Sequence, residues 1–568
     1  MTPTATTTKE RRARTDAPAG PRLMSINPVT RVGGSLGVKV EVDDGLITNA
    51  YALGNLFRGY ENIVSGRDPR DALMVTSRAC GWCGAVHMTT SSMALEMAWG
   101  MEVPPMASAM RSIATATEAI WIHAAHLAVR AAPDYCAPVV QRTSPRLWRR
   151  AASTRAPGAA IHGYKTIGEL MEGLIPASGR YWTETIPAGR RVQQMINLLY
   201  GKYPHPSVLI PGGLTQTLSI GTFTEYFTRI YLSVDYVKEV VALWDDLIDF
   251  LYEADPRFMD LGTRPTSFIH AGCWDDVRAS NAFGALDETG RRRLAGPGVM
   301  VNGQLVTESL SDVHNGIEED VSHSFYERWE ASGGVDPVGA SLPSGHPWSK
   351  RTIPKPAPAD PNGSYSWSTA PRWRGEVVES TPLGRLWLTA LRNDLPPNEF
   401  IESTGKSVRI LVPLNMYPEM VVEWRIPDRA NALERLRADA YGIAFAGLCA
   451  AISLLRGFEL TRTGEVDRHV SFKVKKGPSA GVGLWESGRG MNVHWVRMDK
   501  GRMTGYQILG PSTWNVSPRD ASGKLGPLEE ALVGSPIMEV PGDDGSLTGI
   551  DALRVIHSFD PCMNCAVH

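Results

Sequence analysis

The sequence is poor in cysteine, has no excess charge of either sign and lacks long apolar segments. Seven cysteines in 568 residues exclude a scaffold built on disulfide bonds. Lysine and arginine number 58 against 60 acidic residues. This balance excludes nucleic acid as the main partner, because phosphate binding requires a basic excess. No run approaches the roughly 18 apolar residues of a membrane span, and the N-terminus lacks a signal peptide's apolar core. We therefore expect a cytoplasmic protein that contacts a membrane only through a partner.

The composition otherwise indicates a folded protein with a large core. Hydrophobic residues make up 43% and charged residues 21% of the chain, a balance typical of soluble globular proteins. Residues 1–22 are rich in Thr, Arg, Ala and Pro, and we expect them to form a disordered arm. The sequence shows no internal repeat and no convincing linker, so we expect residues 23–568 to form one large unit.

Periodic patterns predict the secondary structure. Apolar residues alternate from Leu36 to Val42 before the turn residues Asp44-Gly45, which predicts an N-terminal β-hairpin. From Asp71 to about Ala132 the pattern is helical, with interruptions at Gly100 and at residues 104–105.

Two further segments predict long helices. Residues 222–254 carry an apolar stripe, and Thr222 with Glu225 forms a possible capping box. A second segment runs from about Asn431 to Leu455. Both exceed the average helix of about 11–12 residues, which indicates a central bundle.

The remaining patterns complete the predicted fold class. Residues 332–375 are rich in Pro, Gly, Ser and Trp and predict a long irregular excursion. Short alternating runs return from Val470 to Ile508. We therefore predict an α+β protein with a central bundle of long helices, an N-terminal antiparallel sheet and smaller peripheral β segments.

Four of the seven cysteines form two Cys-x-x-Cys pairs. Cys80 and Cys83 lie near the start of the chain, and Cys562 and Cys565 lie among its last seven residues. Two residues between the thiols allow both sulfurs to face one metal.

Zinc or an iron–sulfur cluster is the ordinary interpretation of four thiolates. A zinc ribbon, however, places its pairs about 15–20 residues apart, whereas these pairs lie at opposite ends of the chain. A redox dithiol explains one pair but not two matched pairs. The chemistry of the residues therefore indicates a four-thiolate metal site and leaves the metal open.

The residues around the cysteines resemble a known family. Arg78-Ala-Cys-Gly-Trp-Cys-Gly-Ala-Val-His87 and Asp560-Pro-Cys-Met-Asn-Cys-Ala-Val-His568 are similar to the paired signature of nickel–iron hydrogenase large subunits. The resemblance covers residues 24–568 and makes residues 23–568 the expected catalytic domain. Intermediate segments agree with it: Phe57–Glu61, Gly66–Arg70, Tyr203–Pro206, Pro211–Gly213, Tyr365–Trp367, Ala370–Arg372 and Pro511–Asn515.

The resemblance implies a bimetallic centre. Cys80 and Cys562 correspond to terminal nickel ligands, and Cys83 and Cys565 to bridges between nickel and an iron that carries carbon monoxide and cyanide. Soft thiolates suit such metals and can accept a proton.

The resemblance also implies residues around the metals. His87 corresponds to a residue that hydrogen-bonds a cysteine sulfur, although a satisfied core histidine explains it equally well. Arg489 corresponds to the arginine held over the open face of the metals, and Asp560 to the aspartate beside the terminal pair. Pro511 and Ser512 match the positions that cradle one cyanide.

A magnesium site is implied as well. Its expected ligands are Glu61, the backbone carbonyl of Asn492 and His568, with several waters retained. The alternative for Glu61 is a residue at a helix start that pairs with Arg58.

The sequence departs from the family at three positions on the proton path and over the metals. Many members have Arg-x-Glu-Gly-His, whose glutamate passes protons from a terminal cysteine, and Gly33 stands at that position here. Where many members have an aspartate beside a histidine over the metals, this chain offers Glu118, His123, Ala124 and His126. Gly488 replaces the proline that often precedes the arginine. The metal ligands are unaffected.

The resemblance implies reversible heterolytic cleavage of dihydrogen, with oxidation as the expected direction. A dihydrogen sensor on the same scaffold is the alternative, and a quinone-site subunit of respiratory complex I is a remoter one that lacks both cysteine pairs. Electrons leave such a centre through iron–sulfur clusters, each usually held by four cysteines. Cys136, Cys273 and Cys449 cannot complete such a set, so we expect an obligate iron–sulfur small subunit and a higher oligomer of heterodimers.

Overall fold

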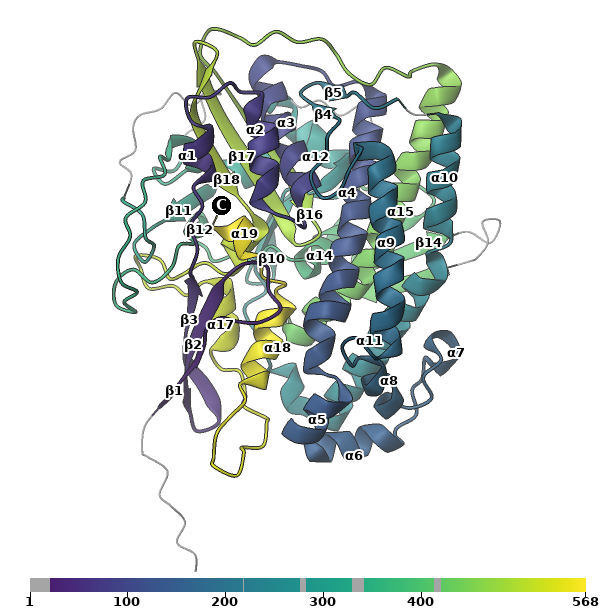
Figure 1. The fold of residues 1–568 in the computed structure, drawn as a ribbon, viewed down its shortest axis with the longest axis vertical. Helices are drawn as coiled ribbons and strands as arrows, with labels where there is room; N and C mark the ends of the chain where they lie inside the picture. Colours follow the sequence, from purple (N-terminus) through teal and green to yellow (C-terminus); the bar gives the residue numbers. More distant parts are fainter. Residues whose placement is uncertain (1–20, 218, 276–281, 329–341, 413–419, 568) are drawn as a thin grey trace, which may run out of the picture.

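The structure is a computed structural model that describes residues 21–217, 219–275, 282–328, 342–412 and 420–567. Long helices stand side by side along one flank, and small antiparallel sheets lie along the other (Figure 1). The bundle contains α4 (Pro105–Ala125), α9 (Arg180–Tyr200), α11 (Val234–Ala254) and α15 (Ala432–Thr463). The predicted α+β fold class is confirmed.

The longest helix, α15, forms the centre of the bundle and packs along α4. It begins where the side chain of Asn431 accepts a hydrogen bond from the Glu434 amide at 2.9 Å, and it ends at Gly464 in the left-handed conformation (φ 83°). The predicted helix from Asn431 is confirmed, although it extends beyond Leu455. By length and composition α15 could cross a membrane, but 89% of its apolar window is buried inside the protein. Burial explains its apolar character without a membrane.

The prediction of one helix over residues 222–254 is wrong. The chain forms α10 (Ile220–Tyr231) and then α11, with a break at Leu232 and Ser233. The predicted capping box is wrong too, because the N-cap of α10 is Ser219, whose side chain accepts from the Thr222 amide at 3.1 Å. Both helices bury the same apolar face, so the stripe alone does not reveal a break of two residues.

The predicted N-terminal hairpin is confirmed. Strands β1 (Arg22–Ile26), β2 (Leu36–Asp43) and β3 (Leu46–Gly54) form an antiparallel sheet in that order. Asp44 and Gly45 make the turn with positive φ. The helical stretch from Asp71 is also confirmed, with α3 (Gly84–Trp99) ending at Gly100 and α4 starting at Pro105.

A second three-stranded sheet is formed by the last third of the chain. It consists of β16 (Ser479–Ser487), β17 (Gly490–Asp499) and β18 (Arg502–Leu509), with α3 packed on it. Strands β16 and β17 are buried almost throughout rather than on one face, which differs from the alternation that the sequence predicts, whereas the start of β18 does alternate. Of the predicted irregular excursion, residues 342–375 are mostly irregular, and residues 332–341 lie outside the described residues.

The remaining elements are short or peripheral. They are α1 (Tyr60–Val64), α2 (Asp71–Thr76), α5 (Ala137–Thr143), α6 (Pro145–Ser153), α7 (Ala159–His162), α8 (Ile167–Gly173), α12 (Leu286–Arg291), α13 (Leu310–Asn315), α14 (Pro382–Leu391), α16 (Pro511–Asn515), α17 (Pro527–Leu532), α18 (Ile550–Ser558), α19 (Met563–Ala566), β4 (Leu209–Ile210), β5 (Gly213–Leu214), β6 (Phe268–His270), β7 (Cys273–Asp275), β8 (Arg293–Ala295), β9 (Gly298–Val301), β10 (Gln304–Thr307), β11 (Ile317–Asp320), β12 (Ala370–Trp373), β13 (Ile401–Ser403), β14 (Ser407–Val412) and β15 (Met420–Arg425).

Candidate metal centre

The two ends of the chain meet at the cysteines. Cys83 immediately precedes α3, and Cys562 immediately precedes α19, which contains Cys565. The guanidinium of Arg58 joins the two segments, because it donates to the carbonyl of Ala79 and, at 2.6 Å, to that of Asn564. The fold thus places four thiols that are distant in sequence at one point.

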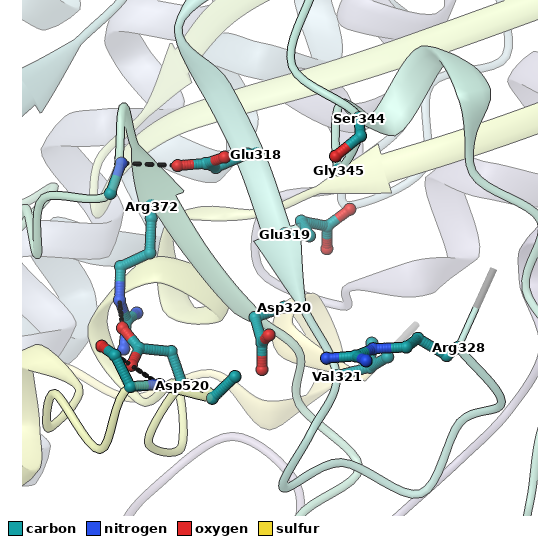
Figure 2. Close-up of a pocket in the computed structure, with 12 residues that line it drawn as sticks. Glu318, Glu319, Asp320, Val321, Arg328, Ser344, Gly345, Arg372 and Asp520 are labelled. Atoms are coloured by element: carbon teal, nitrogen blue, oxygen red, sulfur yellow. Dashed lines mark hydrogen bonds and ion pairs between the residues drawn. The ribbon is translucent and has the colours of Figure 1, made fainter. Parts of the chain in front are cut away.

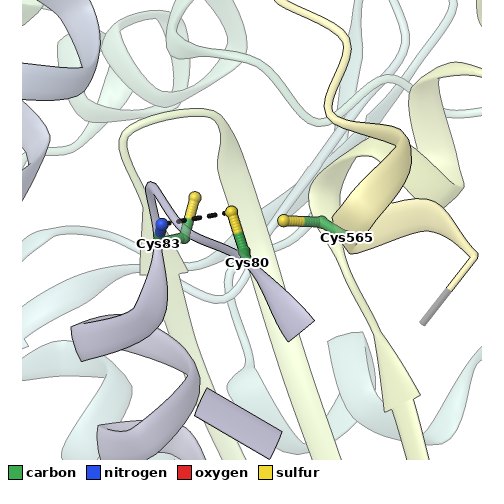
Figure 3. Close-up of side chains that lie close together, drawn as sticks. All are labelled: Cys80, Cys83 and Cys565. Atoms are coloured by element: carbon green, nitrogen blue, oxygen red, sulfur yellow. Dashed lines mark hydrogen bonds between the residues drawn. The ribbon is translucent and has the colours of Figure 1, made fainter. Parts of the chain in front are cut away.

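The four sulfurs form one buried cluster. The Cys562 sulfur lies 3.5 Å from that of Cys80 and 3.3 Å from that of Cys565. Cys80, Cys83 and Cys565 hold their sulfurs within 4.8 Å of one another, and Figure 3 shows these three side chains converging from the two segments. Their solvent exposure does not exceed 1%. The structure therefore brings all four predicted ligands together.

The cluster is poorly suited to four neutral thiols. Hydrogen bonds from Cys565 and Cys80 lower the pKa of Cys83 to about 5. The hydrogen bond from Cys565 would also lower the pKa of Cys562, but the bond to Cys80 and burial outweigh it and raise that pKa to about 12. One thiolate is thus stabilised at the expense of the others. A bound metal cation removes this conflict, because it holds several thiolates at once.

Arg489 brings permanent positive charge to the sulfurs. It lies in the tight turn between β16 and β17, and its Nη1 donates to the Cys83 sulfur at 3.0 Å. Its Nε lies 2.7 Å from a carboxylate oxygen of Asp560. Burial would raise the pKa of Asp560, but the charges of Arg130 and Arg489 outweigh burial and hold it below its usual value. The two predicted residues Arg489 and Asp560 therefore adjoin the cluster as an ion pair, and Arg130, which the sequence did not indicate, also binds Asp560.

One nitrogen of the Arg489 guanidinium makes no hydrogen bond to the described residues. This nitrogen is the buried Nη2 atom, and an unpartnered buried cationic group is costly. The position of this nitrogen beside the thiols fits a site built to hold a further group. Four soft thiolates and an unsatisfied guanidinium together fit a thiolate-bound metal centre with small anionic ligands.

Pro511 and Ser512 form the first turn of α16, next to the C-terminal cysteines. The Ser512 hydroxyl accepts a hydrogen bond from the Cys562 amide at 2.9 Å. A Cβ on the preceding Gly510 would lie 2.5 Å from the Cys565 carbonyl oxygen, so only glycine permits this approach. Both predicted residues are therefore at the cluster, and Ser512 fixes the backbone of one ligand.

His87 lies one helical turn after Cys83. Its Nδ1 is 3.0 Å from Nε2 of His494, whose Nδ1 in turn is 2.7 Å from the hydroxyl of Tyr506. All three side chains are buried. The sequence interpretation missed His494 and Tyr506, because neither lies in a cysteine motif.

The predicted magnesium residues lie along the second sheet. Glu61 is 4% exposed, and one of its carboxylate oxygens accepts from the Ile508 amide at 2.8 Å while the other accepts from the Thr352 hydroxyl. Asn492 is buried in β17. His568 lies outside the described residues.

Glu118, His123 and His126, which stand where many family members have other residues, all make hydrogen bonds within the protein. Glu118 accepts hydrogen bonds from the amides of Ala85 and Val86, both at 3.1 Å, and so caps the start of α3 behind Cys83. His123 and His126 lie 2.6 and 2.9 Å from the two carboxylate oxygens of Asp439. These two histidines therefore tie α4 and the turn after it to α15.

A separate acidic cleft contains none of the predicted site residues. Its volume is about 490 Å³, and Glu318, Asp320 and Asp520 line it (Figure 2). Arg372 binds Asp520 at 2.8 Å, and the Gly375 amide donates to Glu318. These charges are engaged within the protein, so the cysteine cluster remains the candidate centre.

Comparison with known proteins agrees with this assignment. Residues 58–147 and 177–568 match the family of nickel-dependent hydrogenases. The chain is 28% identical to the periplasmic NiFeSe hydrogenase large subunit of Desulfomicrobium baculatum, over 98% of this chain and 96% of that protein. It is 27% identical to the uptake hydrogenase large subunit of Rubrivivax gelatinosus, over 96% of this chain and 95% of that protein.

A solved structure is more similar still. The actinobacterial-type NiFe-hydrogenase from Ralstonia eutropha is 36% identical, with a TM-score of 0.93 over 96% of this chain and all of that chain. Fold and site together define a thiolate-bound metalloenzyme subunit of the oxidoreductase class. The chain belongs to the nickel-dependent hydrogenase family, as a large subunit of the nickel–iron type.

Proposed function

We propose that this chain catalyses the heterolytic cleavage of dihydrogen, with oxidation as its direction in the cell. The proposal is carried by one observation: four buried cysteine sulfurs from both ends of the chain converge beneath the Arg489 guanidinium. Uptake hydrogenase large subunits are among its relatives, which supports oxidation as the direction.

The ligand roles follow the pattern of the motifs. Cys80 and Cys562 would bind nickel alone, while Cys83 and Cys565 would bridge nickel to an iron that carries carbon monoxide and cyanide. When bound, the metal pair supplies the redox-active Lewis-acid centre at which dihydrogen is split. Pro511, Ser512 and the free Nη2 of Arg489 would face the small iron ligands.

Side chains of the protein accept the proton that dihydrogen cleavage releases and stabilise the charge that develops. The Cys562 sulfur is the proposed proton acceptor, because the motif makes it a terminal ligand and a terminal thiolate can take up a proton. Arg489 remains protonated, since Asp560 and the cysteines raise its pKa further despite its burial. Its role is therefore electrostatic: it stabilises negative charge on the sulfurs and their ligands. Asp560 holds the guanidinium in position.

Electron transfer requires a second chain. The three remaining cysteines are Cys136, Cys273 and Cys449, and three thiols cannot complete a four-cysteine cluster. The protein's relatives are named as large subunits, which supports an iron–sulfur small subunit as the partner. We propose an apolar, permanent interface with it and a higher oligomer of the heterodimers.

Magnesium is the proposed ion beside Glu61. The Glu61 carboxylate, the Asn492 carbonyl and His568 would be its protein ligands. Such a site would fix the C-terminal segment that carries Cys562 and Cys565. A cytoplasmic location also remains an expectation, and one relative is named as periplasmic.

Infrared spectroscopy with metal analysis tests the proposal. Native protein should contain nickel and iron and absorb in the region of metal-bound carbon monoxide and cyanide, where protein does not absorb. Zinc without nickel would overturn it. A dihydrogen sensor would carry the same centre and bands, so turnover with an artificial acceptor separates the two: slow turnover in the intact complex would favour the sensor.

A further inference from the structure

A basic segment lies at the end of the bundle away from the cysteines. Between Asp134 and Glu169 the sequence contains five arginines and one lysine and no acidic residue, whereas the whole chain has a net charge of −2. Four of these arginines lie on α5 and α6, which are at the lower end of the bundle in Figure 1, far from α19. This segment is therefore much more basic than the chain as a whole.

The arginines of α6 line a cleft of about 760 Å³. Arg146, Arg149 and Arg150 belong to α6, and Arg257 lies on the segment that follows α11. All four are exposed. The volume is within the range of about 300–1,000 Å³ that is typical of small-molecule sites.

The charges of the cleft are only partly neutralised. Among the described residues, Asp255 is the one acidic residue that lines it, and it binds Arg257 at 2.6 Å. Arg150 donates to the backbone carbonyl of Glu253 at 2.9 Å, and Arg149 to that of Pro145 at 3.4 Å. Backbone carbonyls do not cancel a guanidinium charge, so three arginines present net positive charge to the cleft.

Part of the lining of the cleft is apolar. Leu147, Phe258 and Met538 line it and are 9%, 2% and 9% exposed. Val540, also in the lining, is 48% exposed. A cleft that serves only to bind an inorganic anion does not need an apolar wall. This arrangement fits a ligand with an anionic group at one end and an apolar or aromatic group at the other.

We propose that this cleft binds an organic phosphate. The phosphate would lie on Arg146, Arg149 and Arg150, because the planar guanidinium forms paired hydrogen bonds to phosphate oxygens. The apolar part of the ligand would pack mainly on the exposed Val540, beside the largely buried Leu147, Phe258 and Met538. Two sources share this chemistry, a soluble nucleotide and a phospholipid headgroup with its acyl chains. Because the cleft is remote from the metal centre, occupancy does not depend on dihydrogen turnover.

Binding to the purified native complex tests the proposal. Calorimetric titrations use ADP and inorganic pyrophosphate, and vesicle sedimentation compares phosphatidylglycerol with phosphatidylcholine. The double variant Arg146→Gln, Arg149→Gln should weaken binding roughly tenfold or more, since each lost charged hydrogen bond has a large effect. The control is Arg190→Gln, Arg191→Gln, which removes equal charge from exposed positions on α9. Dihydrogen oxidation should be unchanged in both variants.

The outcomes separate the sources. ADP that binds more tightly than pyrophosphate, and loses affinity only in the α6 variant, identifies a nucleotide site. Binding to phosphatidylglycerol vesicles alone, with the same dependence on α6, identifies a lipid headgroup site. The proposal is overturned if no probe binds, if the α6 variant binds normally, or if both double variants weaken binding equally.

Discussion

The backbone of Gly33 lies directly against Cys562. The two residues form an isolated parallel bridge, in which the Gly33 amide donates to the Pro561 carbonyl at 3.1 Å. A Cβ built on Gly33 would lie 3.2 Å from the Cys562 sulfur. Gly33 thus occupies the position from which a side chain would reach a proposed nickel ligand, and here that position offers no carboxyl group.

We expect Gly33→Ala to perturb the metal centre while the fold is kept. The added methyl carbon would lie closer to the Cys562 sulfur than an ordinary van der Waals contact, so the sulfur must move by a few tenths of an ångström. A ligand shift of this size should lower turnover by roughly two- to tenfold and shift the infrared bands of the iron ligands. Gly81→Ala is the control, because a Cβ there meets nothing within 4 Å. Turnover and bands identical to wild type would show that the contact is unimportant.

The sequence predicts the site better than it predicts the helices. Local motifs fix Cys80, Cys83, Cys562 and Cys565 as one site, because close spacing within each pair and chemistry common to both pairs are visible without a structure. The contribution of Arg130 is not visible, since its contact with Asp560 joins residues that are distant in the chain and belong to no motif. Contacts of this kind depend on tertiary packing alone.

The secondary structure shows the same contrast between features set by local sequence and features set by tertiary packing. The hairpin at Asp44-Gly45 and the helix end at Gly100 are predictable, because each depends on the backbone preference of one or two residues. The break between α10 and α11 is not, because Leu232 and Ser233 carry no strong turn signal and both helices bury one continuous face. The buried strand β17 lacks the expected alternation, since it is covered on both faces.

Arg489→Lys should abolish most turnover without loss of metal. Lysine keeps the charge but cannot contact the Cys83 sulfur and Asp560 together. By analogy with the loss of a preorganised donor, turnover should fall about 10²- to 10³-fold. Nickel and iron content measured by mass spectrometry should match wild type. Arg497→Lys on β17, outside the cluster, should retain activity. If Arg489→Lys turns over normally, the electrostatic role of Arg489 is wrong.

Cys565→Ser should lose both activity and iron. A hydroxyl is a poor substitute for a bridging thiolate. Cys136→Ser is the matched control, because Cys136 is also buried and its thiol donates to the Pro133 carbonyl at 3.2 Å, a bond that a hydroxyl can replace. The expected result is metal loss in the first variant and none in the second. Retention of nickel, iron and turnover by Cys565→Ser would contradict its assignment as a ligand.

Removal of Val567 and His568 should destabilise the C-terminal segment together with the magnesium site. Val567 is 1% exposed, so the truncation also removes apolar burial, and Val567→Ala separates this packing effect from loss of His568. The readouts are magnesium and nickel content and protease sensitivity of the segment. A truncated protein with a complete centre and full magnesium would show that His568 is not the anchor.

Glu379 is the centre of a buried ionic network behind the C-terminal segment. Arg435 contacts both of its carboxylate oxygens at 2.9 Å, and Arg264 lies 3.5 Å away. The Arg435 guanidinium also stacks on Phe559, just before Asp560, at 4.0 Å from the ring centre. Burial would raise the pKa of Glu379, but the charge and hydrogen bonds of Arg435 outweigh it, so the pKa lies below its usual value of 4.5.

This lowered pKa determines how stability should depend on pH. Above pH 4.5 both the folded and unfolded carboxyl groups are ionised, and the network contributes in full; as pH falls through the folded pKa, the contribution is lost. Glu379→Gln leaves two buried arginines without their anion and should destabilise the protein by about 3–5 kcal/mol near pH 7. The difference from wild type should shrink below pH 4.5. Urea unfolding followed by near-ultraviolet circular dichroism measures both effects. The exposed Glu459→Gln should behave as wild type, and an equal, pH-independent loss in both variants would refute the network's role.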